Sequence, residues 1–302
     1  MKKHFDPVSL RLFIAVCEER NIARAAEREA IVPSAISKRI AAIEEDIGAP
    51  LLTRGRRGIE PTAAGQALLT RARDILSTME RLHGELSEFA SGVRGNVRIF
   101  ASISALSEFL ASDVGSFLSH HEAVRVSLEE RLSPDIVRGI REGAADFGVC
   151  WDASDMTGLQ LLPYRADRLS VVVPASHPLA ARKRVAFADT LRYPQVDVQP
   201  GSIMQSMLAR YAALAGRTIN RRIQVSTFEA ASRSVAANLG IAIIPRESAS
   251  VYAKPLNLRV QPLADDWAQR RFVVWMRSRE ALSPAARMLV DHLAQVARRA
   301  AR

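Results

Sequence analysis

Apolar residues near the N-terminus recur at steps of three and four, the spacing of one face of an α-helix. A first helix is predicted from an apolar face made of Leu10, Phe13, Ile14 and Cys17. A second is predicted over residues 22–29, with Asn21 placed to cap its N-terminus. A third should start near Pro33, because proline suits the first turn of a helix. Residues 22–47 are therefore predicted to form two short helices that meet at a tight corner.

The third helix is predicted to have two contrasting faces. Its buried stripe would consist of isoleucines spaced four, three and four residues apart, namely Ile36, Ile40, Ile43 and Ile47. The opposite face would carry Ser34, Ser37, Lys38 and Ala41. Short side chains and a cation suit a helix that sinks into the DNA major groove. The alternative is that this face is an ordinary solvent-exposed helix face. The sequence of this helix, taken alone, favours the alternative.

A basic loop after the third helix shifts the balance towards DNA. Arg54, Arg56 and Arg57 surround Gly55 and Gly58, so three guanidinium groups would project from a flexible turn. A wing that contacts the phosphate backbone or the minor groove needs such a loop. We therefore expect a winged helix-turn-helix. Its DNA-binding residues would be Arg24, Pro33, Ser34, Ser37, Lys38, Arg39, Arg54, Arg56 and Arg57.

Residues 8–66 resemble the N-terminal signature of LysR-type transcriptional regulators. The resemblance rests on Leu12-Phe13 through Glu18, Ala25-Ala26, Ser34-Ala35-Ile36-Ser37, Ile43-Glu44 with Gly48, Leu51-Leu52-Thr53-Arg54 and Thr62-Ala63-Ala64-Gly65. The chain departs from many relatives at Val32-Pro33-Ser34, where they carry Ser-Gln-Pro, and at Leu52, where they carry an aromatic residue. The resemblance implies a ligand-responsive regulator that binds promoter or operator DNA as a tetramer built from dimers.

A long helix is expected to follow Thr62, a residue suited to cap it. Its apolar positions alternate steps of four and three through Leu68, Ala72, Ile75, Met79, Leu82, Leu86 and Phe89. So narrow a stripe is typical of a pairing surface, and the resemblance implies that the same helix of a second copy covers it. Packing against the C-terminal part of the same chain is the alternative. Residues 91–95 would end the helix and form a hinge.

From residue 96 onward, short apolar strands alternate with amphipathic helices, which predicts an α/β domain with largely parallel sheets. Strands are expected at residues 97–101, 124–129, 147–151, 169–173, 195–198, 223–226, 241–244 and 272–276. Helices are expected at residues 104–118, 133–141, 202–215, 227–238 and 284–299. The resemblance implies a two-lobed fold like that of periplasmic binding proteins, with the ligand between the lobes.

These expectations divide the chain into three parts. The first is a winged helix-turn-helix DNA-binding domain (1–62), and the second is a linker and dimerisation helix with its hinge (63–95). The third is an effector-binding domain (96–302), with lobe I at 96–164 and 267–302 and lobe II at 165–266.

Three strand-to-helix turns of the C-terminal region carry small hydroxyl residues. In open α/β sheets, ligands bind beyond the carboxyl ends of strands, where free N–H groups and helix dipoles favour an anion. Serine and threonine also cap helices without any ligand, so each turn alone is weak evidence. Because the resemblance implies a ligand between the lobes, we expect a small-molecule effector, a small organic acid with a carboxylate. The expected effector-binding residues are Ser102, Ser104, Trp151, Gly201, Ser202, Thr227 and Phe228.

Composition adds little to the DNA argument. The net charge of +10 favours an acidic partner, yet residues 1–62 hold 11 Lys/Arg against 9 Asp/Glu, a balance of +2 that leaves +8 for the rest. The two cysteines, Cys17 and Cys150, argue against a disulfide framework or a metal site. Neither a signal peptide nor a run of about 18 apolar residues is seen. We therefore expect a soluble cytoplasmic protein.

Two other functions remain open at this point. A solute-binding module of a transport system would suit the C-terminal lobes, although residues 8–65 and the lack of a signal peptide count against it. An enzyme acting on the bound molecule is the other, although no glycine elbow, triad spacing or phosphate loop is found. We expect no enzymatic activity, no cofactor and no metal.

Overall fold

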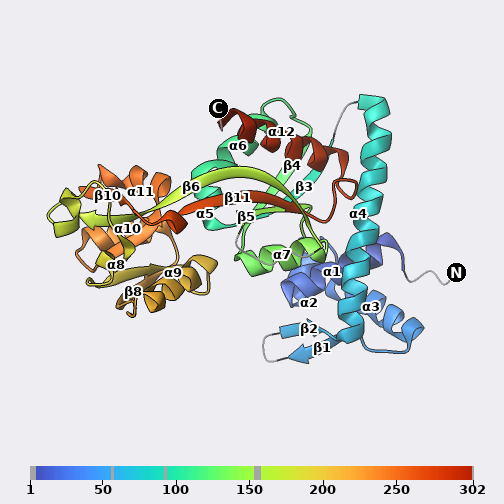
Figure 1. Ribbon diagram of the computed structural model, residues 1–302. Coiled ribbons are helices and arrows are strands. Elements are labelled where there is room, and N and C mark those ends of the chain that lie inside the picture. The colour runs from blue at the N-terminus through green and yellow to red at the C-terminus, as the bar shows by residue number, and fades with distance from the viewer. Residues whose placement is uncertain (1–4, 56–57, 92–93, 153–157, 301–302) are drawn as a thin grey trace.

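The computed structural model describes residues 5–55, 58–91, 94–152 and 158–300. The N-terminal elements gather around the lower half of one long helix, and the C-terminal region extends away from it as two lobes joined by two long strands (Figure 1). Among the described residues, no helix is long and apolar enough to cross a membrane.

The N-terminal elements are α1 (Pro7–Glu19), α2 (Ile22–Arg28), α3 (Pro33–Ile47), β1 (Leu52–Gly55) and β2 (Gly58–Pro61). Side chains cap the first two helices: Asp6 accepts hydrogen bonds from the backbone N–H groups at the start of α1, and Asn21 does so for α2. The region expected as a loop contains a two-stranded antiparallel hairpin, β1 with β2. The core of this part includes the fully buried side chains of Phe13, Ile36, Ile43 and Leu51.

The long helix α4 spans Ala63–Ser91, and Thr62 caps it by accepting a hydrogen bond from Gly65 N at 3.0 Å. The expected apolar stripe divides into two parts. Ala72 is fully buried and Leu68 partly buried against α1 and its neighbours, so the prediction that they belong to a pairing surface is wrong. Ile75, Met79, Leu82 and Leu86 are exposed, as a pairing surface requires. The side chain of Phe89 lies outside the described part of the chain.

The C-terminal strands are β3 (Gly95–Ala101), β4 (Val124–Glu130), β5 (Phe147–Trp151), β6 (Gln160–Pro174), β7 (Gln195–Val198), β8 (Arg221–Val225), β9 (Ile241–Pro245), β10 (Leu258–Pro262) and β11 (Gln269–Met276). They pair in the order β4-β3-β5-β11-β6-β9-β7-β8, with β10 beside β6.

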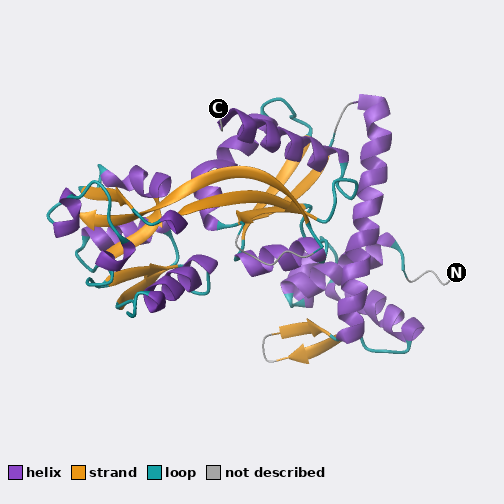
Figure 2. Cartoon of the chain, in the orientation of Figure 1, coloured by secondary structure: helices purple, strands orange, loops and turns teal. Residues whose placement is uncertain are grey.

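The sheet is mixed, so the prediction of largely parallel sheets is wrong. β3 pairs in parallel with β4 and β5, and β7 does so with β8 and β9. Every pairing made by β6 and β11 is antiparallel, because β6 carries the chain from one lobe to the other and β11 brings it back. Figure 2 shows these two strands as long arcs that span both lobes.

Helices cover both lobes. They are α5 (Ile103–Ala105), α6 (Ala111–Leu118), α7 (Ser133–Arg141), α8 (Phe187–Thr190), α9 (Ile203–Leu214), α10 (Phe228–Ala236), α11 (Arg246–Ala253) and α12 (Pro284–Ala300). Short 3-10 helices form at Pro178–Ala181 and Asp266–Ala268. The helix expected at residues 104–118 is interrupted by a π-helical segment, η1 (Leu106–Leu110).

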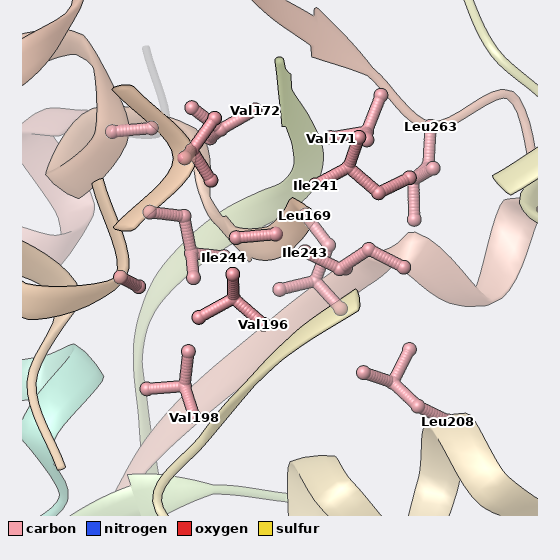
Figure 3. Close-up of a cluster of buried hydrophobic side chains, with 14 of the residues drawn as sticks. Leu169, Val171, Val172, Val196, Val198, Leu208, Ile241, Ile243, Ile244 and Leu263 are labelled. Atoms are coloured by element: carbon pink, nitrogen blue, oxygen red, sulfur yellow. The ribbon is translucent and has the colours of Figure 1, made fainter. Parts of the chain in front are cut away.

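Each lobe has its own hydrophobic core. The core of lobe I packs β3, β5 and the end of β11 against α6 and α12, and includes Phe117, Phe147 and Leu289. In lobe II, valines and isoleucines from β6, β7 and β9 interlock beneath α9 and α10, as Figure 3 shows for Val171, Val196 and Ile243. Since the cores are separate and the connecting strands are only two, the space between the lobes is the natural place for a ligand cavity.

Candidate functional site

Helix α3 presents the polar face that the sequence predicts. Ser34, Ser37, Lys38 and Ala41 are exposed, while Ile36, Ile40 and Ile43 are buried. The prediction is wrong for Ile47, which is 43% exposed and lies outside the buried cluster that contains the other three isoleucines. The exposed serines and lysine leave α3 free to enter a groove with its N-terminal half.

The other expected DNA-binding residues differ in their surroundings. Arg39 pairs with Asp6 at 3.2 Å and donates to Ser9 Oγ at 3.0 Å, so it ties α3 to the start of α1. Arg24 is exposed, with Glu19 at 3.7 Å, and Pro33 is exposed at the first turn of α3. Arg56, Arg57 and the side chain of Arg54 lie outside the described residues, and their role stays a prediction.

Arg73 of α4 links the N-terminal helices to lobe I, a role that the sequence did not indicate. Its side chain is 7% exposed and lies 3.1 Å from Glu18 of α1 and 3.4 Å from Glu142, which caps α7. The neighbouring Asp74 pairs with Arg277, just beyond β11. Arg73, Glu18 and Glu142 border a hollow of about 710 Å³ between the N-terminal helices and lobe I. These ion pairs thus connect the N-terminal helices with lobe I.

A small cavity of about 30 Å³ lies between the two lobes. Four of the expected effector-binding residues line it: Ser102, Ser104, Trp151 and Ser202. Ser102 and Ser202 each use the side-chain oxygen to cap the following helix, at 3.5 Å from Ala105 N and 3.1 Å from Gln205 N. Both residues therefore cap a helix and also line the cavity.

The other three expected residues, Gly201, Thr227 and Phe228, are not among the residues that line this cavity. Phe228 is 3% exposed and packs in the core of lobe II. Thr227 is exposed and accepts a hydrogen bond from Ala230 N at 3.1 Å, which makes it the cap of α10. The N–H of Gly201 donates to the side chain of Gln205 at 2.9 Å, so it is already satisfied.

The cavity wall also contains Arg270, a buried cation that sequence reasoning missed. Its guanidinium forms two hydrogen bonds with the carboxylate of Asp167, the residue opposite it in the β6–β11 pairing. Nη2 of Arg270 also donates to Ser104 Oγ at 3.3 Å, and Cζ of Arg270 lies 5.3 Å from the centroid of the Phe272 ring. Buried guanidinium groups favour carboxylate partners with planar, two-point geometry.

Glu108 of the segment η1 adds a second buried carboxyl to this cluster. Burial raises the pKa of Glu108 to about 9, helped by the negative charge of Asp167 and by a hydrogen bond to Asp167 that protonated Glu108 can donate. The atom Oε1 of Glu108 is buried and has no hydrogen-bond partner in the described structure. The raised pKa favours the neutral form of the Glu108 carboxyl group.

A winged helix-turn-helix joined by a long helix to a two-lobed α/β domain with a cavity between the lobes defines a DNA-binding protein that responds to a ligand. Two family models match the chain. "Bacterial regulatory helix-turn-helix protein, lysR family" covers residues 8–66, and "LysR substrate binding domain" covers residues 90–298. The chain belongs to the LysR family of transcriptional regulators. It is a DNA-binding transcriptional regulator with an effector-binding domain, and not an enzyme.

Similar proteins span the same length. The HTH-type transcriptional regulator YnfL of Escherichia coli (strain K12), itself uncharacterized, is 29% identical over 94% of this chain and 96% of its own. The regulator CbbR of Xanthobacter flavus is 28% identical over 97% of this chain and 88% of its own.

Solved structures show the same fold. A full-length OxyR variant from Pseudomonas aeruginosa has a TM-score of 0.74 and 18% identity, covering 98% of both chains. Full-length CbnR complexed with its target DNA has a TM-score of 0.67 and 24% identity, covering 98% of this chain and 99% of that one.

Proposed function

We propose that this regulator binds its operator through α3 and the wing, and that a small organic acid held between the lobes controls it. The observation that carries the effector class is the buried guanidinium of Arg270 in the wall of the cavity. The cavity also has the serine hydroxyls of Ser102, Ser104 and Ser202 and the N-terminus of α9, all of which favour an anion. Trp151 supplies an apolar wall for the rest of the molecule.

We propose the domain division that the sequence predicts: a winged helix-turn-helix at 1–62, a linker at 63–95 and an effector-binding domain at 96–302. Lobe I would comprise 96–164 and 267–302, and lobe II would comprise 165–266. The separate hydrophobic cores of the N-terminal helices, lobe I and lobe II support it.

The DNA contacts are proposed for the exposed side of α3 and the basic residues around it. Ser34, Ser37 and Lys38 would reach base edges, and Arg24 with the wing arginines would contact phosphates. Lys38→Ala should weaken binding to a duplex from the protein's own promoter region by about 5- to 150-fold, the range for loss of one base contact worth about 1–3 kcal/mol.

The matched control is Lys183→Ala, which removes an exposed lysine from lobe II. It should bind the duplex as the unaltered protein does. Fluorescence anisotropy at several salt concentrations measures both variants. Equal affinity for Lys38→Ala and Lys183→Ala would remove α3 from the interface. Arg56→Ala combined with Arg57→Ala should weaken binding to all sequences and flatten its salt dependence.

We further propose a homodimer formed through α4, and a homotetramer built from two dimers. The stripe of Ile75, Met79, Leu82 and Leu86 supports the dimer, because four large apolar side chains in water on one helix face form a surface that a second copy can cover. Leu82→Glu should shift light-scattering mass towards smaller species, whereas Ala67→Glu, an exposed position off this stripe, should not. Identical masses for the two variants would rule out this dimer surface.

The effector class is tested with a thermal-shift screen of small carboxylates, each compared with its neutral amide. A ligand that binds the native state alone raises the apparent stability by mass action. We expect shifts with acids, smaller or absent shifts with amides, and loss of the acid response in Arg270→Met. Amides that stabilise as well as their acids would argue against an anionic effector.

A further inference from the structure

A second hollow, of about 400 Å³, lies between the N-terminal helices and lobe I. It adjoins the larger hollow described above, because Arg28, Arg73 and Arg98 line both. Its volume falls within the range of small-molecule sites, about 300–1,000 Å³. The charged residues in the described part of its wall are five arginines and one glutamate, namely Arg11, Arg28, Arg73, Arg98, Arg125 and Glu29. This composition suits an anion.

Lobe I contributes the polar face of β3 and β4 to this wall. Val97 and Ile99 of β3 enter the core of lobe I. Because side chains alternate between the two faces of a strand, Arg98 lies on the opposite face. In the pairing of β3 with β4, Arg125 stands opposite Asn96, two residues away from Arg98. Long side chains at such diagonal positions can reach the same point above a sheet. Two guanidinium groups from neighbouring strands are thus placed on one wall.

Ion pairs account for the other three arginines. Glu29 lies 3.2 Å from Arg11 and 3.6 Å from Arg28. The arginine of α4, Arg73, makes the two ion pairs described above. These three side chains therefore connect elements of the protein whether or not a ligand is bound.

The guanidinium groups of Arg98 and Arg125 have no such partner. Across the residues that the structure describes, neither group forms an ion pair or a hydrogen bond. Arg98 donates its backbone N–H to Asp146 at 2.7 Å, and its side chain acts on Asp146 through charge alone. The buried Nε of Arg73 also has no hydrogen-bond partner in the described structure. The wall of the hollow thus keeps donors that a ligand can use.

Two neighbouring guanidinium groups match a phosphate group better than a carboxylate. A carboxylate has two oxygens, and a single guanidinium in two-point geometry occupies both. The three terminal oxygens of a phosphomonoester can accept hydrogen bonds from two guanidinium groups. The same wall has an apolar part, formed by Ile14, Leu76 and Val126, which suits the organic part of such a molecule.

We propose that this hollow is a second ligand site, which holds a small phosphomonoester by its phosphate group on Arg98 and Arg125. The organic part of the ligand lies against the apolar part of the wall. Since Arg11 and Arg28 come from the N-terminal helices and the phosphate-binding pair comes from lobe I, the bound molecule bridges the two. It favours the arrangement of the DNA-binding domain and lobe I in which both walls reach it. The site is separate from the cavity between the lobes.

Operator DNA is the other source of phosphate groups, and the packing of α3 argues against it. Ile36 and Ile40 of α3 share a core with Leu10 and Phe13 of α1, so the polar face of α3 points away from α1. The hollow borders a different side of α1, which carries Arg11. A duplex that lies on the polar face of α3 is therefore not expected to fill the hollow.

The test uses phenyl phosphate as the probe, titrated calorimetrically at an ionic strength fixed with sodium chloride. Arg125→Gln removes an exposed guanidinium, so the fold should be kept. It should weaken binding of phenyl phosphate by about tenfold or more. The matched control, Arg210→Gln, removes an exposed arginine from α9 of lobe II and should leave the affinity unchanged. Inorganic phosphate should bind more weakly than phenyl phosphate, because it lacks the organic part.

Four results would overturn the site. Phenyl phosphate does not bind, or Arg125→Gln and Arg210→Gln have equal effects, which would indicate attraction to the net positive charge of the protein. Loss of binding in Lys38→Ala would place the probe at the DNA-binding face, and loss in Arg270→Met would place it between the lobes. Because the carboxylate effector is tested with different ligands, failure here leaves that proposal intact.

Hydrogen exchange tests the bridge between the two walls. Phenyl phosphate should slow exchange both in peptides over residues 22–28, which form α2, and in peptides over residues 124–130, which form β4. Both effects should be absent in Arg125→Gln and present in Arg210→Gln. Slower exchange in neither region, or in only one of them, would contradict a ligand that joins the N-terminal helices to lobe I.

Discussion

Replacing Gly65 with alanine should destabilise the DNA-binding end by forcing the hairpin away from α4. A β-carbon at this position would lie 2.0 Å from the carbonyl oxygen of Leu51 and 3.1 Å from Cβ of Pro61. Carbon–oxygen contacts need about 3.3 Å, so the carbonyl must retreat by more than about 1 Å. That carbonyl accepts a hydrogen bond from Thr62 N at 2.9 Å, and Leu51 is fully buried just before β1.

The cost can be worked out from these contacts. Overpacking a close contact costs about 1–3 kcal/mol, and loss of the hydrogen bond from Thr62 N costs about 1 kcal/mol. Alanine lowers the entropy of the unfolded chain, which returns about 0.4–1 kcal/mol. We therefore expect Gly65→Ala to lower the free energy of unfolding of this part by about 1–3 kcal/mol. Because β1 begins at Leu52, the position of the wing should change as well.

Gly115→Ala is the matched control, because a β-carbon at Gly115, inside α6, would meet nothing within 4 Å. It should stabilise lobe I by about 0.5–1 kcal/mol. The three tryptophans, Trp151, Trp267 and Trp275, all lie in the C-terminal region, so their fluorescence does not report on the hairpin. Hydrogen exchange of peptides over residues 51–66 does report on it. Slow exchange there in Gly65→Ala, together with unchanged DNA affinity, would refute the steric reasoning.

Two further predictions concern buried charges. Arg73→Met removes the guanidinium between Glu18 and Glu142 but keeps the apolar stem of the side chain. Because both carboxylates are partly solvated, the substitution should weaken the contact between α1 and α7 by about 1–3 kcal/mol. Hydrogen exchange should become faster in α7 and α1 than elsewhere, and unchanged exchange would contradict the prediction. The pKa of Glu108 rises from 4.5 in the unfolded chain to about 9, so the folded state keeps a proton that the unfolded state loses. As far as Glu108 is concerned, the stability of the folded state should therefore be highest below pH 4.5 and should fall as the pH rises towards 9. Urea unfolding at several pH values should show this slope removed in Glu108→Gln, and parallel curves would disprove it.

Local patterns predicted the elements whose faces are set by nearby residues. The apolar stripe of α3 and the helix at Ser133–Arg141 could be read from the sequence because short-range periodicity decides which side is buried. Ile47 shows the limit of this reasoning. Its spacing continues the apolar stripe of α3, but periodicity cannot predict whether another element covers that position, and Ile47 is exposed. The first half of β6 was missed for a related reason: residues 160–168 contain a proline and no regular alternation of apolar and polar residues, and pairing with β11 makes them a strand.

The functional cluster could be predicted only in part. Small hydroxyl residues at strand ends marked Ser102, Ser104 and Ser202, because turn chemistry is visible locally. Arg270 and Asp167 come together only through the register of two strands distant in sequence. Without knowledge of that register, nothing in the sequence distinguishes Arg270 from the other arginines near the C-terminus. Glu108 was hidden by a π-helical turn that helical periodicity would not produce.

Strand β11 connects the cavity to the DNA-binding end through named contacts. Arg270, near its start, lines the cavity, and Arg277, just past its end, pairs with Asp74 of α4. The adjacent Arg73 then contacts Glu18 of α1. Hydrogen bonds to β5 and β6 stiffen the strand on both sides. The register with β6 shifts between Arg271 and Val273, which is where a displacement of Arg270 can be absorbed. A ligand that prefers one position of Arg270 must therefore either deform this bulge or move Arg277 and α4.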